Sequence, residues 1–173
     1  MSKRLLTITT LTGALILAGC GQPGKVTGGG TMHSAGGSDK SVFTFHADSC
    51  DEGQVKGSMN LHDSSALDFE DVNGVKLKAD VDSTYFCSGD LDFDAPLCAC
   101  SEGFQEVNFT YQSTNPKTDG GGQGIACLGD FGEKGNSDLK GAAIISISTG
   151  PYSGYYNVGT VSGNVQQHSC PAE

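Results

Sequence analysis

The sequence predicts an all-β protein, an antiparallel β-sandwich or barrel of about 8–10 short strands stapled by disulfides. Three observations lead to this class. Apolar and polar residues alternate with period two in several segments, and no segment repeats its apolar residues with the period of a helix. Glycine, with 26 of the 173 residues, is abundant between these segments, where it favours turns.

Length, composition and charge exclude several classes of protein. A chain of 173 residues fits one domain, and its 36% hydrophobic residues suffice for a core, which argues against wholesale disorder. Much glycine and few strong helix formers argue against a helix bundle. The formal net charge is −10, and the only arginine is Arg4. Nucleic acid is therefore excluded as a partner, because phosphate binding needs clustered lysine and arginine.

The first 19 residues have the pattern of an export signal. Lys3 and Arg4 precede an apolar run over residues 5–17, which is too short to span a bilayer as a helix. The run ends in Leu17-Ala18-Gly19-Cys20, which resembles the lipobox of bacterial lipoproteins. That resemblance implies that residues 1–19 are a lipoprotein signal peptide and that Cys20, carrying acyl chains such as palmitate, becomes the mature N-terminus. An ordinary signal peptide is the alternative.

The lipobox resemblance also implies a location and a domain organisation. Gly21 follows the cysteine, a pattern associated with sorting to the outer membrane of Gram-negative bacteria. We therefore expect a lipid-anchored protein of the bacterial cell envelope, with a lipidated N-terminus and short tether over residues 20–24 and one β-sandwich domain over residues 25–173. The mature chain keeps eight lysines and 20 acidic residues, so anionic headgroups repel its body while the anchor on Cys20 holds it at the membrane.

The six cysteines after Cys20 predict three disulfides, because an even number of cysteines in an exported domain usually forms bridges. A bridge between Cys98 and Cys100 would close a strained ring and is excluded, while the pairing is otherwise open. A metal site that uses Cys98-Ala99-Cys100 with a histidine is the alternative, although zinc ribbons usually separate paired thiols by two residues. The candidate disulfide residues are Cys50, Cys87, Cys98, Cys100, Cys127 and Cys170.

Three segments in the first half of the chain alternate like strands with one buried face. In residues 41–48 the inward residues are Phe43, Phe45 and Ala47. In residues 54–61 they are Val55, Gly57, Met59 and Leu61, and in residues 75–82 they are Val75, Leu77, Ala79 and Val81. Asn73-Gly74 is the strongest hairpin signal, because both residue types tolerate positive φ.

Four more strands are predicted over residues 90–93, 107–111, 142–148 and 160–167, with Val107, Phe109, Tyr111, Val161 and Val165 as inward residues. Glycine-rich turns are predicted at residues 119–124, 129–136 and 150–154. Residues 120–124 lack the lysine of a phosphate-binding Walker loop, so we expect a surface turn there. After the last turn we expect Tyr155 or Tyr156 to pack inward, with presentation of these rings to a partner or glycan as the alternative.

Segments near both ends of the mature chain resemble a known family. Residues 25–30 (KVTGGG) look like the opening strand of the small secreted bacterial β domains called post-choice-of-anchor (post-COAP) domains, and residues 159–168 (GTVSGNVQQH) look like their closing strand. Residues 53–63 fit their second strand region. The resemblance implies a β-sandwich with apposed terminal strands, and it makes residues 25–30 a strand where composition alone favours a linker. It implies no catalytic residue.

Asp90, Asp92 and Asp94 form the candidate calcium site. Their carboxylates occupy alternate positions, and calcium prefers several converging oxygens. An EF-hand loop beginning at Asp90 would need glycine and glutamate where the chain has Ala95 and Ser101. We therefore expect a strand with a solvated acidic face, and keep a calcium site of another type as the alternative, with Asp80, Asp82 or Glu102 as further ligands; no other cofactor is expected.

No catalytic constellation accompanies the histidines. His62-Asp63 suits a hydrolase, but the G-x-S-x-G motif of a nucleophile elbow is missing. We therefore expect a non-enzymatic lipoprotein with an envelope-structural role, or a binding role toward a protein or glycan partner. A calcium-dependent adhesive module that uses residues 90–94 is the second hypothesis, and a small extracytoplasmic hydrolase with His62 or His168 as base is the third.

Overall fold

The structure is a computed structural model that describes residues 20–51, 54–89, 97–132 and 141–170. The expected signal peptide, the predicted strand over residues 90–93 and part of the predicted turn at residues 129–136 lie outside these ranges. The described strands form one antiparallel sheet in the order β10-β2-β3-β4-β5-β6-β7-β8-β9, and β1 pairs separately with β5. The strands are β1 (Cys20–Gln22), β2 (Gly24–His33), β3 (Lys40–Asp48), β4 (Lys56–Asp63), β5 (Val75–Ser88), β6 (Phe104–Ser113), β7 (Gly121–Gly129), β8 (Ala142–Ile147), β9 (Tyr156–Thr160) and β10 (Ser162–Ser169).

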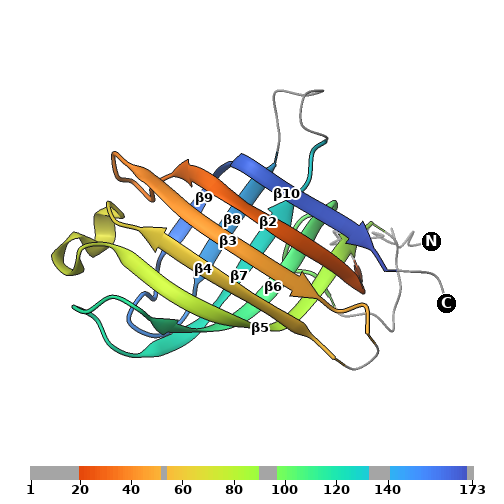
Figure 1. The fold of residues 1–173 in the computed structure, drawn as a ribbon, viewed down its shortest axis with the longest axis horizontal. Helices are drawn as coiled ribbons and strands as arrows, with labels where there is room; N and C mark the ends of the chain where they lie inside the picture. The colour runs from red at the N-terminus through yellow and green to blue at the C-terminus, as the bar shows by residue number, and fades with distance from the viewer. Residues whose placement is uncertain (1–19, 52–53, 90–96, 133–140, 171–173) are drawn as a thin grey trace, which may run out of the picture.

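The sheet is curled so that its two ends approach each other. Figure 1 shows β10, β2, β3 and β4 crossing in front of β7, β8 and β9. At the seam, Asn157 of β9 donates a hydrogen bond from Nδ2 to the carbonyl oxygen of His33 in β2, at 2.8 Å. The sheet is thus nearly closed, and the predicted all-β antiparallel class is confirmed.

The core lies inside the curled sheet and consists of the residues that alternate inward along its strands. In β3 the inward residues Phe43, Phe45 and Ala47 are buried, as predicted, and in β4 so are Met59 and Leu61. Val55 was expected on this inward face but precedes β4 and is 38% exposed, because β4 begins only at Lys56. The other predicted inward residues that are buried are Val75, Leu77, Ala79, Val81, Val107, Phe109, Tyr111, Val161 and Val165.

The glycine-rich segment after the expected cleavage site is part of the sheet. β2 pairs with β3 on one side and with β10 on the other, so that Gly28 lies between Phe45 and Val165. Residues 25–30 are therefore a strand, and β2 and β10 lie side by side (Figure 1). The stretch expected to be a tether is also extended, because residues 20–22 form β1 and pair with residues 86–88 of β5.

The first predicted glycine turn, at residues 119–124, is wrong over most of its length. Residues 121–124 begin β7 and pair with residues 109–112 of β6. Glycine is accommodated in this strand because the rings of Phe109 and Tyr111 occupy the space next to Gly124 and Gly122 where side chains would otherwise lie. The high glycine content of residues 119–124 suggested a turn, whereas packing against the rings of Phe109 and Tyr111 accommodates residues 121–124 in a strand.

Two further strand boundaries differ from those predicted, because the segments that connect the strands have a different structure. Asn73 and Gly74 have positive φ, as predicted, at 63° and 81°, but they follow the 3-10 helix η1 (Leu67–Val72) instead of forming a two-residue hairpin. The predicted last strand is divided, since Thr160 ends β9 and Ser162 begins β10. The predicted turn at residues 150–154 is confirmed; Tyr155 after it is buried, whereas Tyr156 is exposed.

Three disulfides join Cys50 to Cys170, Cys87 to Cys98, and Cys100 to Cys127. The three predicted bridges are confirmed, and the alternative metal site on Cys98 and Cys100 is not formed, because each of these residues is bonded to a different cysteine. The last two bridges hold the segment before β6 against β5 and β7. Their sulfur atoms form a small cluster with Phe104, Ile125 and Ile144, separate from the main core.

In the part of the chain that the structure describes, no helix has the length and apolar character needed to cross a membrane.

Candidate functional site

A cavity of about 730 Å³ lies at the end of the sheet where β1, β5, β6 and β10 converge. In Figure 1 this is the end at which β10 finishes, on the right. Its volume is within the range of about 300–1,000 Å³ that small-molecule sites occupy. The lining residues are Gln22, Pro23, Phe86, Gln105, Gln167, His168, Ser169 and Cys170. We call it the end cavity.

Gln105 supplies the most deeply buried polar group of the end cavity. Its side chain is 1% exposed, and its Nε2 donates to Oγ1 of Thr84 at 2.8 Å. Thr84 in turn donates to the Glu106 carbonyl oxygen at 2.8 Å, which fixes the amide. The Gln105 Oε1 atom accepts no hydrogen bond from the described residues. Gly24 makes room for this atom, since a Cβ there would lie 2.9 Å from it.

Gln167 closes the rim of the end cavity. Its Nε2 donates to the carbonyl oxygens of Leu128 at 2.9 Å and Gly103 at 3.2 Å, and its backbone N–H donates to Oδ2 of Asp130 at 3.3 Å. These bonds hold β10 against the ends of β6 and β7. Like that of Gln105, the Oε1 atom of Gln167 accepts no hydrogen bond within the described ranges.

The remaining walls are apolar or weakly polar. Phe86 and Pro23 offer apolar surface, and the Cys50–Cys170 disulfide fixes the end of β10. Asp48 accepts the Cys50 backbone N–H at 3.0 Å, and chiefly this bond lowers the pKa of Asp48. No acidic side chain of the described residues lines the end cavity, so His168 has no carboxylate there to orient it as a base. The arrangement suits binding.

The expected lipidation residue lies close to the end cavity. Cys20 begins β1, and Gln22, two residues later, is part of the lining. Because β1 pairs with β5, the chain between the two positions is held against the sheet. An acyl anchor on Cys20 would therefore keep this end of the sheet near the membrane.

His62 and Asp63 do not form a catalytic pair. His62 is exposed on the outside of β4, opposite Lys76 of β5, whereas Asp63 is fully buried on the inside. The Asp63 carboxylate accepts hydrogen bonds from the Ser34 hydroxyl, the Ala35 backbone N–H at 2.9 Å and the Tyr155 hydroxyl at 3.0 Å. Burial, and then the nearby Asp63 carboxylate, raise the pKa of Tyr155 well above its ordinary value. These bonds join β4 to segments next to β2 and β9, which is a structural role.

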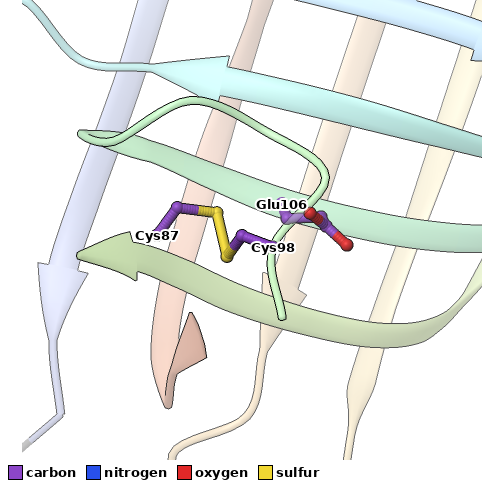
Figure 2. A group of neighbouring side chains, drawn as sticks. All are labelled: Cys87, Cys98 and Glu106. Atoms are coloured by element: carbon purple, nitrogen blue, oxygen red, sulfur yellow. A yellow bond between two sulfur atoms is a disulfide. The ribbon is translucent and has the colours of Figure 1, made fainter. Parts of the chain in front are cut away.

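The metal-ligand candidates divide into two groups. Asp90, Asp92 and Asp94 lie outside the described residues, so the calcium site stays a prediction from the sequence. The structure instead brings together Cys87, Cys98 and Glu106, shown in Figure 2, with the two cysteines bonded to each other. Sequence spacing did not indicate this group, because its members come from β5, the segment before β6, and β6.

Sequence reasoning missed Gln105, Phe86 and Gln167 as lining residues. One signal was present, a polar residue at an inward position of a strand. Gln105 alternates in step with Val107, Phe109 and Tyr111, so its side chain lies on the same face of β6 as theirs. Gln167 carried the same signal, because it alternates in step with the inward Val165. Phe86 carried none, because the register of β5 shifts between Val81 and Ser83. Only the closure of the sheet brings the three side chains to the same end. Comparisons with protein-family models, curated proteins and solved structures yield no match for this chain.

Proposed function

We propose that the protein is a lipid-anchored bacterial lipoprotein with a non-enzymatic binding role, and that the end cavity is its binding site. The lipobox-like Leu17-Ala18-Gly19-Cys20 supports the anchor, and the three disulfides suit an exported domain. The observation that carries the binding role is Gln105, a 1% exposed side chain that lines the cavity and whose amide is fixed by its bond to Thr84. A polar group held in a fixed position on a largely apolar wall can orient a ligand that carries a hydrogen-bond donor.

The lining indicates the chemical class of the ligand. The amide oxygens of Gln105 and Gln167 favour hydroxyl or amide donors, and Phe86 with Pro23 favours an apolar ring face. Among the described residues, no acidic side chain of the lining is available to pair with a cationic ligand group. The formal net charge of −10 disfavours an anionic ligand. We therefore propose an uncharged, hydroxyl- or amide-bearing ligand with an apolar face.

Binding is tested by NMR of oxidised protein from residue 21 onward. The probes are uncharged saccharides, including a disaccharide of N-acetylglucosamine, and a short uncharged peptide, each at millimolar concentration. We expect saturable shifts of the Gln105 and Gln167 side-chain amides, which Gln105→Leu abolishes. Gln112→Leu, an exposed glutamine on the same strand, is the matched control and should bind as the wild type does. Absence of saturable shifts with every probe would contradict the proposed ligand class.

Anchoring is tested separately with the full chain in a Gram-negative bacterium grown with radiolabelled palmitate. We expect label in the wild type and none in Cys20→Ala, together with release of the variant from the membrane fraction. A double variant of Cys87 and Cys98 to alanine should still be labelled, because its N-terminus is unchanged. Label in Cys20→Ala, or a variant that stays in the membrane fraction, would refute the anchor.

The calcium-dependent alternative has its own test. The melting temperature of the oxidised domain is measured once with calcium and once with chelator. A cation that binds the native state raises the stability of the domain, and so its melting temperature. A rise that disappears in Asp92→Asn would favour the calcium-dependent module, and equal melts would leave the acidic stretch as solvated surface.

A further inference from the structure

Three neighbouring strands of the sheet carry no charged side chain. β7, β8 and β9 contain no lysine, arginine, histidine, aspartate or glutamate. In contrast, β3 and β4, which cross in front of them in Figure 1, expose Lys40 and Lys56, and β5 exposes Lys78, Asp80 and Asp82. The charged side chains of this acidic chain are therefore unevenly distributed around the sheet. We call the outer side of β7, β8 and β9 the uncharged face.

Apolar side chains occupy the uncharged face. In β9, Tyr156 and Val158 are 57% and 55% exposed, while Asn157 between them is buried on the inner side. Val158 lies directly opposite Ile144 of β8, and both Ile144 and Ile125 of β7 pack against the disulfide cluster. Exposed apolar side chains that lie together mark contact surfaces, whereas single ones are common on any protein. The uncharged face therefore has the composition of a contact surface.

The uncharged face continues toward the strand that begins with Cys20. Ile144 contacts the disulfide cluster that includes Cys87. β1 pairs with the end of β5 that holds Cys87, so the first residues of the expected mature chain lie at one border of this surface. Leu97, the neighbour of Cys98 in the Cys87–Cys98 bridge, is 71% exposed. Apolar surface thus extends from β9 to the position of the expected anchor.

Acidic side chains border the uncharged face without lying on its strands. Glu102 is exposed beside Gly89, just after β5, and Asp82 of β5 accepts the Thr110 hydroxyl at 2.7 Å. Glu106 of β6 is 4% exposed, because backbone N–H groups of the segment before β6 cover and bond its carboxylate. The described carboxylates therefore lie around the apolar side chains of β9 and not among them.

We propose that the uncharged face rests on the membrane surface when the chain is anchored through Cys20, an inference that rests on the proposed anchor. Anionic headgroups repel exposed carboxylates, and the strands of this face have none to be repelled. Tyrosine is enriched at the boundary between headgroups and acyl chains, and Val158 adds apolar surface beside Tyr156. A lipid surface is the occupant that the geometry favours, because the anchor strand borders the same face.

The absence of tryptophan from the sequence makes a direct test possible, since one introduced tryptophan reports its own surroundings. Val158→Trp places the fluorescent probe on the uncharged face, and Asn60→Trp places it at an exposed position of β4 as the matched control. The acylated full chain is reconstituted in vesicles of phosphatidylethanolamine and phosphatidylglycerol, with or without bromine on the acyl chains. We expect bromine to quench the emission of Val158→Trp and to leave that of Asn60→Trp unchanged.

The outcomes separate the orientation from the anchor. Mass spectrometry of the same preparation shows whether the protein carries acyl chains. Acylated protein in which neither tryptophan is quenched, or both are quenched equally, would overturn the proposal and leave the anchor in place. A shift of the Val158→Trp emission to shorter wavelength without quenching would assign the face to contact between protein copies. Protein without acyl chains would contradict the anchor, and this orientation with it.

Charge variants test the physical cause of the orientation. Adding Tyr156→Asp to Val158→Trp should abolish the quenching, because phosphatidylglycerol repels a carboxylate placed on the uncharged face. Adding Thr44→Asp, at an exposed position of β3, introduces the same charge elsewhere and should leave the quenching unchanged. Equal quenching in both double variants would contradict the proposed contact. Tyr156→Trp, which exchanges one exposed aromatic ring for another, replaces Val158→Trp as the probe if that variant does not fold.

Discussion

Gly124 of β7 lies directly across the antiparallel ladder from Phe109 of β6, and the Phe109 ring occupies the space where a side chain would otherwise be. A Cβ at Gly124 would meet the ring at 2.5 Å and the Ser146 carbonyl oxygen at 2.6 Å. Phe109 is 1% exposed, and its ring is packed within the main core. This pair explains why a glycine-rich stretch is a strand here.

Gly124→Ala should destabilise the domain by about 1–3 kcal/mol, because an added methyl in a packed region displaces side chains and backbone. Urea unfolding of the oxidised protein measures the change. Gly159→Ala is the control, since the nearest atom to a Cβ there is 3.7 Å away, in Met32. We expect the control to change stability by less than about 0.5 kcal/mol. Equal losses in both variants would contradict the proposed packing.

The three disulfides should contribute unequally. Cys50 and Cys170 are 120 residues apart, whereas Cys87 and Cys98 are 11 apart. If a bridge acts by restricting the unfolded chain, the long loop contributes about 5 kcal/mol and the short one about 3 kcal/mol. Alanine replacement of each pair, followed by denaturant unfolding without reductant, should show the larger loss for the first. Full reduction should loosen or unfold the domain, and an unchanged melting curve would contradict a stabilising role.

Asp63 should be essential for stability although it is not part of the proposed binding site. Asp63→Ala would leave three donors, from Ser34, Ala35 and Tyr155, without their acceptor in a buried region. We expect a loss of about 2–5 kcal/mol in the free energy of unfolding. Asp71→Ala, at an exposed position in η1, is the control and should change stability little. Unaltered binding at the end cavity by any Asp63 variant that folds would confirm that the two regions are separate.

Stability should fall at alkaline pH through Tyr155. Its pKa is raised above the ordinary 10.0, first by burial and then by the Asp63 carboxylate, so the folded state keeps the phenol proton where the unfolded state loses it. The contribution of Tyr155 to the free energy of unfolding is therefore fully present below pH 10 and is lost as the pH rises above that value. The free energy of unfolding then falls by about 1.4 kcal/mol per pH unit, as expected for one proton. Tyr155→Phe should reduce the slope by that amount, and Tyr156→Phe, an exposed tyrosine, should not. Identical slopes in the wild type and Tyr155→Phe would refute this.

The all-β class and several strands could be predicted from the sequence because their cause is local. In β3 the alternation of Phe43, Phe45 and Ala47 with exposed residues matches the period of an extended chain, so it indicated both the strand and its buried face. Positive φ at Asn73 and Gly74 is likewise a property of these residue types. The exclusion of a Cys98–Cys100 bridge needed only covalent geometry.

Tertiary structure decided what depends on distant parts of the chain. Gly121–Gly124 carries no side-chain pattern, and it is a strand because Phe109 and Tyr111 of another strand pack beside it. The pairing of the six cysteines, and the meeting of Cys87 and Cys98 with Glu106, follow from the order of the strands in the sheet. The end cavity joins Gln22, Phe86, Gln105 and Gln167 because the sheet curls until β10 lies near β6 and β7. Residue types and their local period determine a strand and its inner face, whereas closure of the sheet determines which side chains meet.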